Sequence, residues 1–343
     1  MKKKRNHFVP RVLLNRFYSW RDIKKKKFKT WCYQANGQVK EISTRDIALE
    51  KYFYGREDSI LEDRLSSIES NLGNVLRDFD EKSSIKDHQE FLSQYALIQS
   101  FRTKAFRGVA TETLKELLIA RAQKTNTENA RKHFLENGRI EIQKLLSGLT
   151  EDQRLYLKAQ LGGISAEQFA ELYLQHAINS GALGEQLRVL INEAVHQGVI
   201  DDGLAQGHNK ALFEISEDIT RSTVFKDCEW IPVHSANDEF VLGDAGIFII
   251  DKEGNYRSMA DFQNWAFVCF PIDPCTCLFG SRAVGGSFPE LSKVNIGAAS
   301  CSIHSFFASQ EKESLRALIP LINTERKVLS DLEKKEIMDA DWD

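Results

Sequence analysis

The sequence predicts an α+β fold that is predominantly α-helical, with a helical body, a small and mostly antiparallel sheet from the C-terminal third, and an N-terminal β-hairpin. Two observations predict it. Apolar residues recur at intervals of three and four over much of residues 58–221, which is the period of amphipathic helices. From about residue 222, short β-branched and aromatic runs replace that period, as is typical of strands.

The N-terminal segment predicts a tail, a helix and a hairpin. Residues 1–6 are mostly basic, and we expect them to form a mobile tail. Pro10 suits the first turn of a helix, because the N–H that proline lacks has no partner there. The apolar stripe of this helix consists of Val9, Leu13, Leu14 and Phe17. In the hairpin, residues 28–34 and 39–42 are strands and Asn36-Gly37 is the turn.

The helical body divides at glycines and capping residues. Ser165, with Gln168 three residues later, has the spacing of a capping box, and Gly181 and Gly184 interrupt the helix that follows. We expect helices over residues 58–79, 87–123, 128–147, from Ser165 to Gln197 with that interruption, and 203–221.

The last third predicts the sheet and a return to helix from Pro289 onward. The expected strands cover residues 224–233, 239–242, 246–250, 264–270 and 275–279. Composition along the chain thus gives two segments: residues 1–221 hold the basic arm, hairpin and helical body, and residues 222–343 hold the sheet and C-terminal helices. We expect the two segments to pack as one unit.

Composition excludes several classes of protein. No apolar run approaches the roughly 18–20 residues that span a bilayer, so we expect no membrane partner. The basic N-terminus is not followed by the apolar region of a secretory signal. Six cysteines in 343 residues are too few for a disulfide scaffold, so we expect reduced, buried thiols in a cytoplasmic protein.

Charge is distributed unevenly along the chain. Residues 1–30 contain twelve lysines and arginines and one acid, whereas the whole chain has a net charge of −3. A basic arm on an acidic body suggests an anionic partner, most obviously nucleic acid. The alternative is that the arm docks on the protein's own acidic surface or only adds solubility.

Several segments, taken in order, carry a family resemblance: His7 to Arg11 with Leu14 and Arg16-Phe17, Ile47 to Tyr54, Gln99 to Thr103 with Arg107, Phe240 to Asp244, and Phe270 to Pro274. These segments resemble those of domain-of-unknown-function family 4238, a bacterial family whose members begin with H-[FY]-V-P. One departure is that Gly243-Asp244-Ala245-Gly246 stands where the family usually has S-D-N-P. The resemblance implies a shared fold and no particular activity.

Arg102 is the most informative candidate residue, because it falls on the apolar stripe of the helix expected over residues 87–123. A buried arginine needs an anionic or carbonyl partner. Arg102 either faces a polar cleft and binds phosphate, with Gln99 one turn earlier and Arg107 after it, or forms a structural salt bridge to a helix acid.

His7 precedes the first helix, where it can transfer protons, bind a metal, or cap the helix. Arg11 and Arg16 beside it would contact phosphates. Glu69, seven residues after Glu62 on one helix flank, is a candidate ligand for Mg²⁺ or Mn²⁺, and a solvated charged face is the commoner arrangement.

Asp244 ends an expected strand, which is a frequent place for a catalytic carboxylate and also for a residue that organises a turn. We therefore expect a nucleic-acid-acting enzyme, a nuclease of the toxin or phage-defence type, with His7, Arg102 and Asp244 as catalytic residues. The alternatives are a non-catalytic nucleic-acid-binding protein and a protein-interaction module, both of which would use the basic arm.

Overall fold

The computed structural model describes residues 5–54, 59–82, 84–123, 127–217, 225, 227–235, 239–257, 265–282, 288–325 and 335–336. Residues 1–4 of the basic arm, the end of the helix expected over 203–221, the start of the strand expected at 224 and most of the acidic C-terminus lie outside these ranges. The chain divides into two compact units, Met1–Thr111 with Gly203–Val328, and Glu112–Asp202 with Leu329–Asp343. These are called unit 1 and unit 2.

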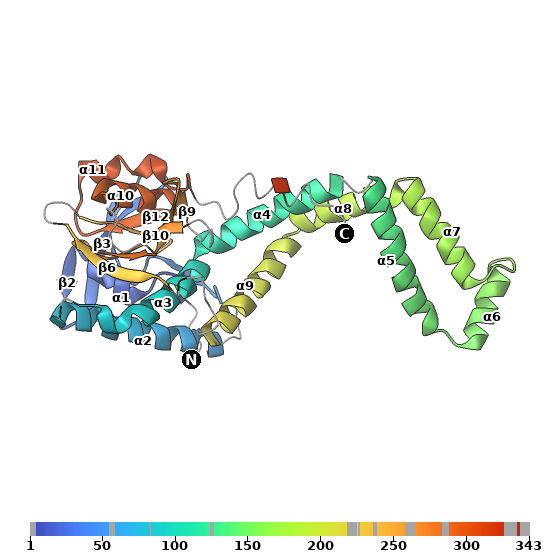
Figure 1. Ribbon diagram of the computed structural model, residues 1–343, viewed down its shortest axis with the longest axis horizontal. Coiled ribbons are helices and arrows are strands. Elements are labelled where there is room, and N and C mark those ends of the chain that lie inside the picture. Colours follow the sequence, from blue (N-terminus) through green and yellow to red (C-terminus); the bar gives the residue numbers. More distant parts are fainter. Residues whose placement is uncertain are drawn as a thin grey trace. The chain divides into compact units, whose positions relative to one another are not determined.

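The helices and strands follow in chain order (Figure 1). Before unit 2 the elements are β1 Arg5–His7, α1 Arg11–Leu14, η1 Asn15–Phe17, β2 Trp20–Asp22, β3 Lys27–Gln34, β4 Val39–Ser43, β5 Leu49–Lys51, α2 Ser59–Lys82, η2 Lys86–His88, α3 Gln89–Arg102 and α4 Lys104–Gln123. The next helices are α5 Glu128–Ser147, α6 Glu151–Gln160, α7 Ala166–Asn179, α8 Ala182–His196 and α9 Val199–Glu217. The last elements are β6 Glu229–His234, β7 Leu242–Gly243, β8 Phe248–Asp251, β9 Tyr256–Arg257, β10 Trp265–Asp273, β11 Thr276–Ser281, α10 Leu291–Ser300, β12 Ser305–Ala308, α11 Glu313–Arg316 and η4 Ile319–Leu321.

The described strands of unit 1 pair antiparallel, as predicted. One five-stranded sheet, in the order β6-β11-β10-β8-β9, comes entirely from the C-terminal third. In a second sheet the predicted β3–β4 hairpin extends to β12 and β7, and β1 pairs with β5 separately. Gly37 in the hairpin turn has φ 85°, a conformation that glycine adopts without strain.

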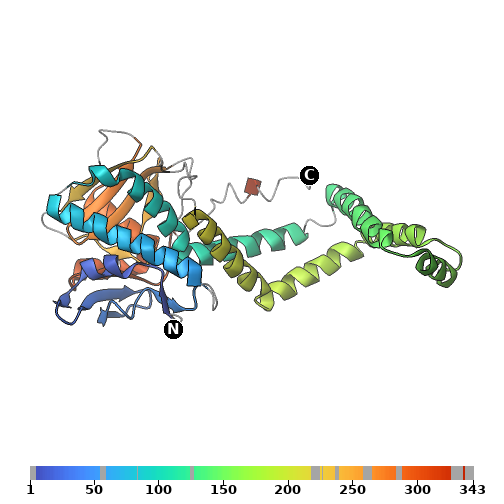
Figure 2. The same ribbon diagram turned by 90° about the horizontal axis from the view of Figure 1, so that it is seen from below.

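The central strands are buried on both faces, which explains their continuous apolar runs. In β10, Val268 and Phe270 face the cluster that includes α2 and α3, whereas Cys269 between them faces the cluster with α10. Figure 1 shows α2 and α3 on one side of the strands and α10 on the other, and Figure 2 shows α2 and α3 crossing the sheet.

Three sequence expectations for unit 1 are wrong. Residues 5 and 6 are not a mobile tail but part of β1. The helix expected over residues 87–123 is broken at Thr103, whose backbone is extended (φ −83°, ψ 154°) and whose Oγ1 accepts the N–H of Phe106 at 3.1 Å, capping α4. Beyond Pro289, β12 interrupts the predicted helices and completes the second sheet.

Unit 2 confirms the helix predictions in part, because α6 was not predicted and Gly184 does not interrupt a helix. Helix α5 has the expected bounds, and Ser165 and Gln168 form the capping box of α7. Gly181, with φ 75°, separates α7 from α8, while Gly184 lies buried within α8. None of the helices in the described ranges is both long and apolar enough to span a lipid bilayer.

Candidate functional site

A polar cavity of about 310 Å³ lies in unit 1 between the N-terminal segment and helices α2 and α3. Strand β1 supplies one wall of the cavity through its three residues. Its pairing with β5, in which His7 lies opposite Leu49, fixes the position of this wall. The lining residues are Arg5, Asn6, His7, Arg11, Tyr54, Glu62, Leu65, Ser66, Glu69 and Arg102. The structure therefore brings together four residues selected from the sequence: His7, Arg11, Glu69 and Arg102.

The wall that carries His7 is anchored by its neighbours. Phe8 and Val9 are buried, and the ring of Phe8 contacts that of Phe53 with 5.9 Å between centroids. Gln99 holds the same segment from α3, because its Nε2 donates to the carbonyl oxygen of Phe8 at 3.0 Å. Gln99 thus stands behind the cavity wall, where it positions the backbone.

Arg102 lies at the inner end of the cavity and is almost completely buried. Its Nε donates to the hydroxyl of Tyr54 and its Nη2 to the carbonyl oxygen of His7, both at 2.8 Å. Nη2 also forms an ion pair with Glu69 of α2. Burial disfavours the charge, but Tyr54 and Glu69 outweigh it and raise the pKa of Arg102 above its ordinary value. The structural salt bridge considered for Arg102 therefore exists.

His7 is uncharged at neutral pH. Burial lowers the pKa of His7 to about 4, and the cation of Arg11 acts in the same direction. Its Nδ1 is shielded from water and has no hydrogen-bond partner among the described residues. A neutral imidazole with a free ring nitrogen is a group that can accept a proton.

Two further buried polar atoms near His7 also lack a described hydrogen-bond partner. Asn6 is 4% exposed, its Nδ2 donates to Glu62 of α2, and its Oδ1 has no partner in the described part of the chain. The Nε of Arg11 is likewise buried without a described partner. Since a buried unsatisfied polar atom costs about 1–3 kcal/mol, these three atoms are candidates for hydrogen bonds to ordered water or to a bound molecule.

Arg107 lies outside this cavity. Its Nη2 donates to the carbonyl oxygen of Phe53 at 2.8 Å and to Asn209 Oδ1 at 2.9 Å, and its guanidinium stacks 3.8 Å from the ring centroid of Phe53. Its Nε also donates to Nδ1 of His208 at 3.1 Å. Burial, followed by the charge of Arg107, lowers the pKa of His208 to about 4. The contacts of Arg107 tie α4 to α9.

Arg16 borders a different cavity, and its guanidinium is bound by two carboxylates. Its Nη1 and Nη2 donate to the two oxygens of Asp80 at 2.8 Å, and Nη2 also donates to Asp273 at 2.9 Å. Its Nε donates to the carbonyl oxygen of Ile272 at 3.0 Å. This part of the basic arm docks on acids of the protein itself, which was the alternative to an anionic partner.

Asp244 does not line the cavity of His7 and Arg102. It is buried, and its carboxylate accepts the backbone N–H groups of Ile303, His304 and Ser305 at 2.8, 2.8 and 3.0 Å. These contacts hold the turn between α10 and β12. The position of Asp244 at a strand end thus corresponds to the organisation of a turn.

Glu69 and Glu62 both line the cavity, but each is bound to a neighbouring side chain, Arg102 and Asn6 respectively. No group of three or more His, Cys, Asp or Glu side chains within the described ranges is placed to hold a metal ion. Three arginines and two glutamates line the cavity, so one formal positive charge remains while His7 is neutral.

The sequence did not single out Arg5 and Tyr54 as parts of this site. Arg5 was assigned to the mobile tail. Its place in the cavity depends on the pairing of β1 with β5, and strands of three residues give no recognisable sequence pattern. Tyr54 stood within a motif, Ile47 to Tyr54, that carried the family resemblance. The signal for its place is its hydroxyl, which is a suitable hydrogen-bond partner for a buried arginine.

Comparison with known proteins gives a family. A family model described as "Protein of unknown function (DUF4238)" matches residues 5–311. The chain belongs to this family. The match covers the cavity and confirms the resemblance of the N-terminal motifs. No curated protein and no solved structure matches the chain.

Proposed function

We propose that this chain of family DUF4238 is a nuclease whose cavity at His7 binds the phosphodiester backbone of RNA. One observation carries the proposal. Three buried polar atoms without described partners, Asn6 Oδ1, His7 Nδ1 and Arg11 Nε, belong to one short segment that lines one cavity. Such clustering indicates a site shaped for a ligand rather than a local packing fault.

The three atoms differ in hydrogen-bonding character, and this difference favours a ribonucleotide. Asn6 Oδ1 accepts a hydrogen bond, neutral His7 accepts a proton, and Arg11 donates to an anion. A ribose 2′-hydroxyl beside a phosphate offers a donor next to anionic acceptors. DNA lacks that hydroxyl, so it would leave the His7 acceptor without a donor.

The same geometry supports a reaction. Neutral His7 would take the proton of the 2′-hydroxyl, and the 2′-oxygen would bond to phosphorus. The bond from phosphorus to the 5′-oxygen would break, and the leaving oxygen would take a proton from water. The products would be a 2′,3′-cyclic phosphate and a free 5′-hydroxyl, while Arg11 would stabilise the charge on the phosphoryl oxygens.

In this proposal Arg102 positions the site. Because its guanidinium is committed to Tyr54, Glu69 and the carbonyl of His7, it fixes the wall that presents the histidine. Its removal should slow cleavage through misplacement of His7. Arg102→Lys, which keeps the charge but has a single donor nitrogen, should restore part of the rate.

The test is incubation of the full chain with end-labelled RNA and DNA in Mg²⁺, Mn²⁺ or EDTA. We expect cleavage of RNA in all three, products with 2′,3′-cyclic phosphate ends, and loss of at least 100-fold in rate for His7→Asn. His208→Asn is the matched control, because His208 is also buried with its pKa lowered to about 4 and lies outside the cavity. Absence of RNA cleavage by the wild type, or equal loss in both variants, would overturn the proposal.

A second candidate, nucleic-acid binding without cleavage, is favoured by the hairpin of β2 and β3. Residues 24–27, all lysines, are exposed, Trp20 is 47% exposed, and the Nζ of Lys29 lies 5.8 Å from its ring centroid. Lysines bind phosphates and an exposed aromatic ring stacks on bases. This candidate predicts a mobility shift that weakens steeply with salt and no cleavage.

The proposed compartment is the cytoplasm, where thiols stay reduced. All six cysteines are free, and five are buried while Cys275 is exposed, so the expectation that all would be buried is wrong for that residue. Degradation of RNA inside the cell would suit the toxin or phage-defence role expected from the sequence.

A further inference from the structure

Unit 2 buries little of its own apolar surface. Among its described residues, Ile178 is the only large hydrophobic side chain that is fully buried. Unit 1, in contrast, contains two large clusters of buried apolar residues. A helical unit of about 90 residues needs a core to be stable, either its own or one completed by a partner.

Helix α7 carries an apolar stripe that is exposed and does not contribute to a core within unit 2. Phe169, Leu172 and Tyr173 are spaced by three and four residues and are 45%, 58% and 64% exposed. The rings of Phe169 and Tyr173 are stacked, with centroids 6.3 Å apart. A helix of a monomer turns such a stripe inward, so an outward stripe indicates an interface.

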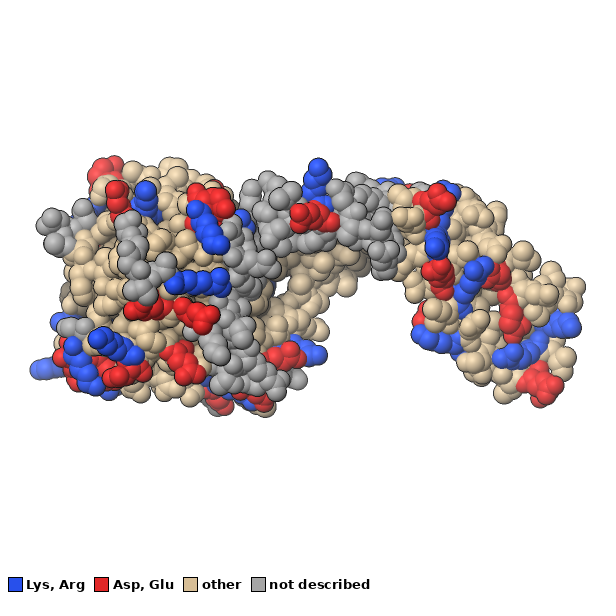
Figure 3. Space-filling view, in the orientation of Figure 1, with Lys and Arg blue, Asp and Glu red and all other residues tan. Residues whose placement is uncertain are grey.

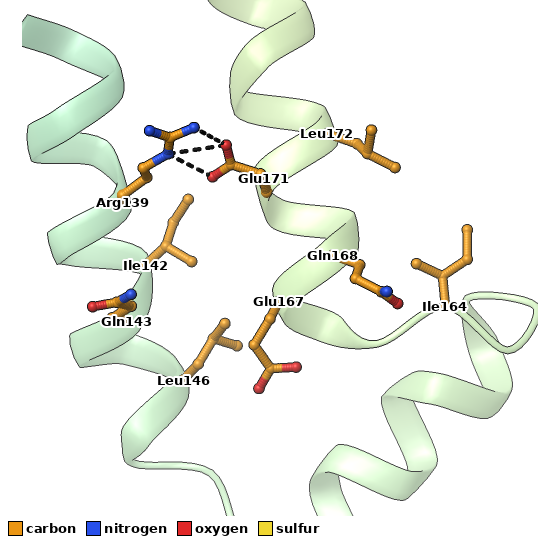
Figure 4. Close-up of a pocket in the computed structure, with 9 residues that line it drawn as sticks. All are labelled: Arg139, Ile142, Gln143, Leu146, Ile164, Glu167, Gln168, Glu171 and Leu172. Carbon is orange, nitrogen blue, oxygen red and sulfur yellow. Dashed lines mark hydrogen bonds and ion pairs between the residues drawn. The ribbon is translucent and has the colours of Figure 1, made fainter.

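The stripe is not covered by the neighbouring helix α5. In Figure 4 Ile142 and Leu146 of α5 point toward α7, whereas Leu172 points away from α5. Between α5 and α7 lies an apolar groove of about 800 Å³, closed at one end by Arg139, whose Nε donates to Glu171 at 2.9 Å. Leu172 also lines this groove, so the exposed apolar surface of α7 is continuous with it.

We propose that a second copy of this chain covers the stripe of Phe169, Leu172 and Tyr173, so that unit 2 is a dimerisation unit. Because the unit lacks a core of its own, its stability depends on the partner that covers it, and a second copy is made wherever the first is made. Pairing of two α7 stripes across a twofold axis would bury each against its equivalent.

The charges of unit 2 disfavour a polyanionic partner. Residues 112–202 carry ten lysines and arginines and thirteen acids, and the two signs are interspersed on the face seen in Figure 3. Residues 329–343, which belong to the same unit, add two lysines and six acids, so unit 2 carries a net charge of −7 and offers little attraction for a polyanion. A nucleic acid is thus a poor occupant for this surface.

The exposed area also suits a dimer. Helix α6 packs on α7 and adds Leu155 and Tyr156, which are 60% and 66% exposed. With Ile164, 40% exposed, and the stripe, six side chains leave on the order of 600 Å² of apolar surface. Because about 65% of a homodimer interface is apolar, the full interface would bury roughly 900 Å² per partner, the size of a stable complex.

Sedimentation velocity of the full chain at several concentrations tests the inference. We expect twice the chain mass of 39.1 kDa, retained in high salt because the contact is apolar. Leu172→Asp should give the monomer mass, and Gln186→Asp, at an exposed polar position of α8, should leave the dimer intact. A wild-type monomer, a dimer that high salt dissociates, or equal behaviour of the two variants would overturn the proposal.

A second measurement needs no variant, in case a charge on α7 unfolds unit 2. Hydrogen exchange of the α7 amides should become faster when the wild type is diluted below its dissociation constant, because the free unit opens more readily. Equal protection at concentrations on both sides of that constant would contradict a dimer held through α7.

Discussion

Replacement of Arg102 by methionine would remove the group that ties three parts of the cavity wall together. The side chain is 4% exposed and bonds Tyr54, Glu69 and the carbonyl of His7. Methionine fills much of the same volume, so the main loss is the charge and its donors. Glu69 and the His7 carbonyl would then lack their partner.

The structure sets the size of the effect. Removal of one member of a buried ion pair costs about 3–5 kcal/mol. Glu69 is 27% exposed, so water can partly solvate the abandoned carboxylate, and the lower end of that range, ~3 kcal/mol, is expected. Replacement of both residues, Arg102→Met with Glu69→Met, should recover at least ~1 kcal/mol because no uncompensated charge remains.

Urea unfolding followed by tryptophan fluorescence measures this cost in unit 1, where Trp230 and Trp265 are buried. The control is Lys104→Met, which breaks a pair with Glu50 whose two side chains are each 40% exposed, and should cost under ~1 kcal/mol. If Arg102→Met cost no more than Lys104→Met, the view that Arg102 organises the cavity would be refuted.

Two other predictions concern pH and Asp244. Because the pKa of His7 is about 4 when folded and near 6.5 when unfolded, the unfolded chain binds the proton more strongly, and the contribution of His7 to stability should fall by up to ~3 kcal/mol as pH drops from 6.5 to 4. Thermal unfolding across this range should show a shallower fall for His7→Asn, and an unchanged slope would contradict the assignment. Asp244→Ala should cost about 3 kcal/mol in urea unfolding, because three backbone N–H groups lose their acceptor, and Asp244→Asn less. The folded fraction of Asp244→Ala should still cleave RNA at the wild-type rate, and its complete inactivity would return Asp244 to the list of catalytic residues.

Local patterns in the sequence were enough to predict most helices and the hairpin. The capping box at Ser165 and the turn at Gly37 depend on neighbours within a few residues, and both are confirmed. The break at Thr103 was missed because the apolar period continues across it. Strand β12 was missed because it has only four residues between two helices and its pairing with β3 joins residues far apart in the chain.

The site was predictable only in part, for a similar reason. The apolar period placed Arg102 on a buried face and required a partner for its charge, and both inferences are confirmed. The identity of the acid that pairs with Arg102 depends on how α2 packs against α3. Glu69 was selected separately, as a metal ligand. Arg16 was selected as a phosphate ligand because its actual partners, Asp80 and Asp273, lie far from it in the sequence. Long-range pairing of charges is what a single sequence does not reveal.

Calorimetric titration of the full chain with a ribonucleoside 3′-monophosphate tests most directly whether the cavity is a ligand site. We predict saturable binding to the wild type, weaker binding of the 2′-deoxy analogue, and a loss of at least tenfold in affinity for Asn6→Ala and Arg11→Gln. Lys104→Gln, outside the cavity, should bind as the wild type does. Absence of binding, or equal affinities for the ribose and deoxyribose forms, would contradict the assignment of Asn6, His7 and Arg11 to a ribonucleotide site.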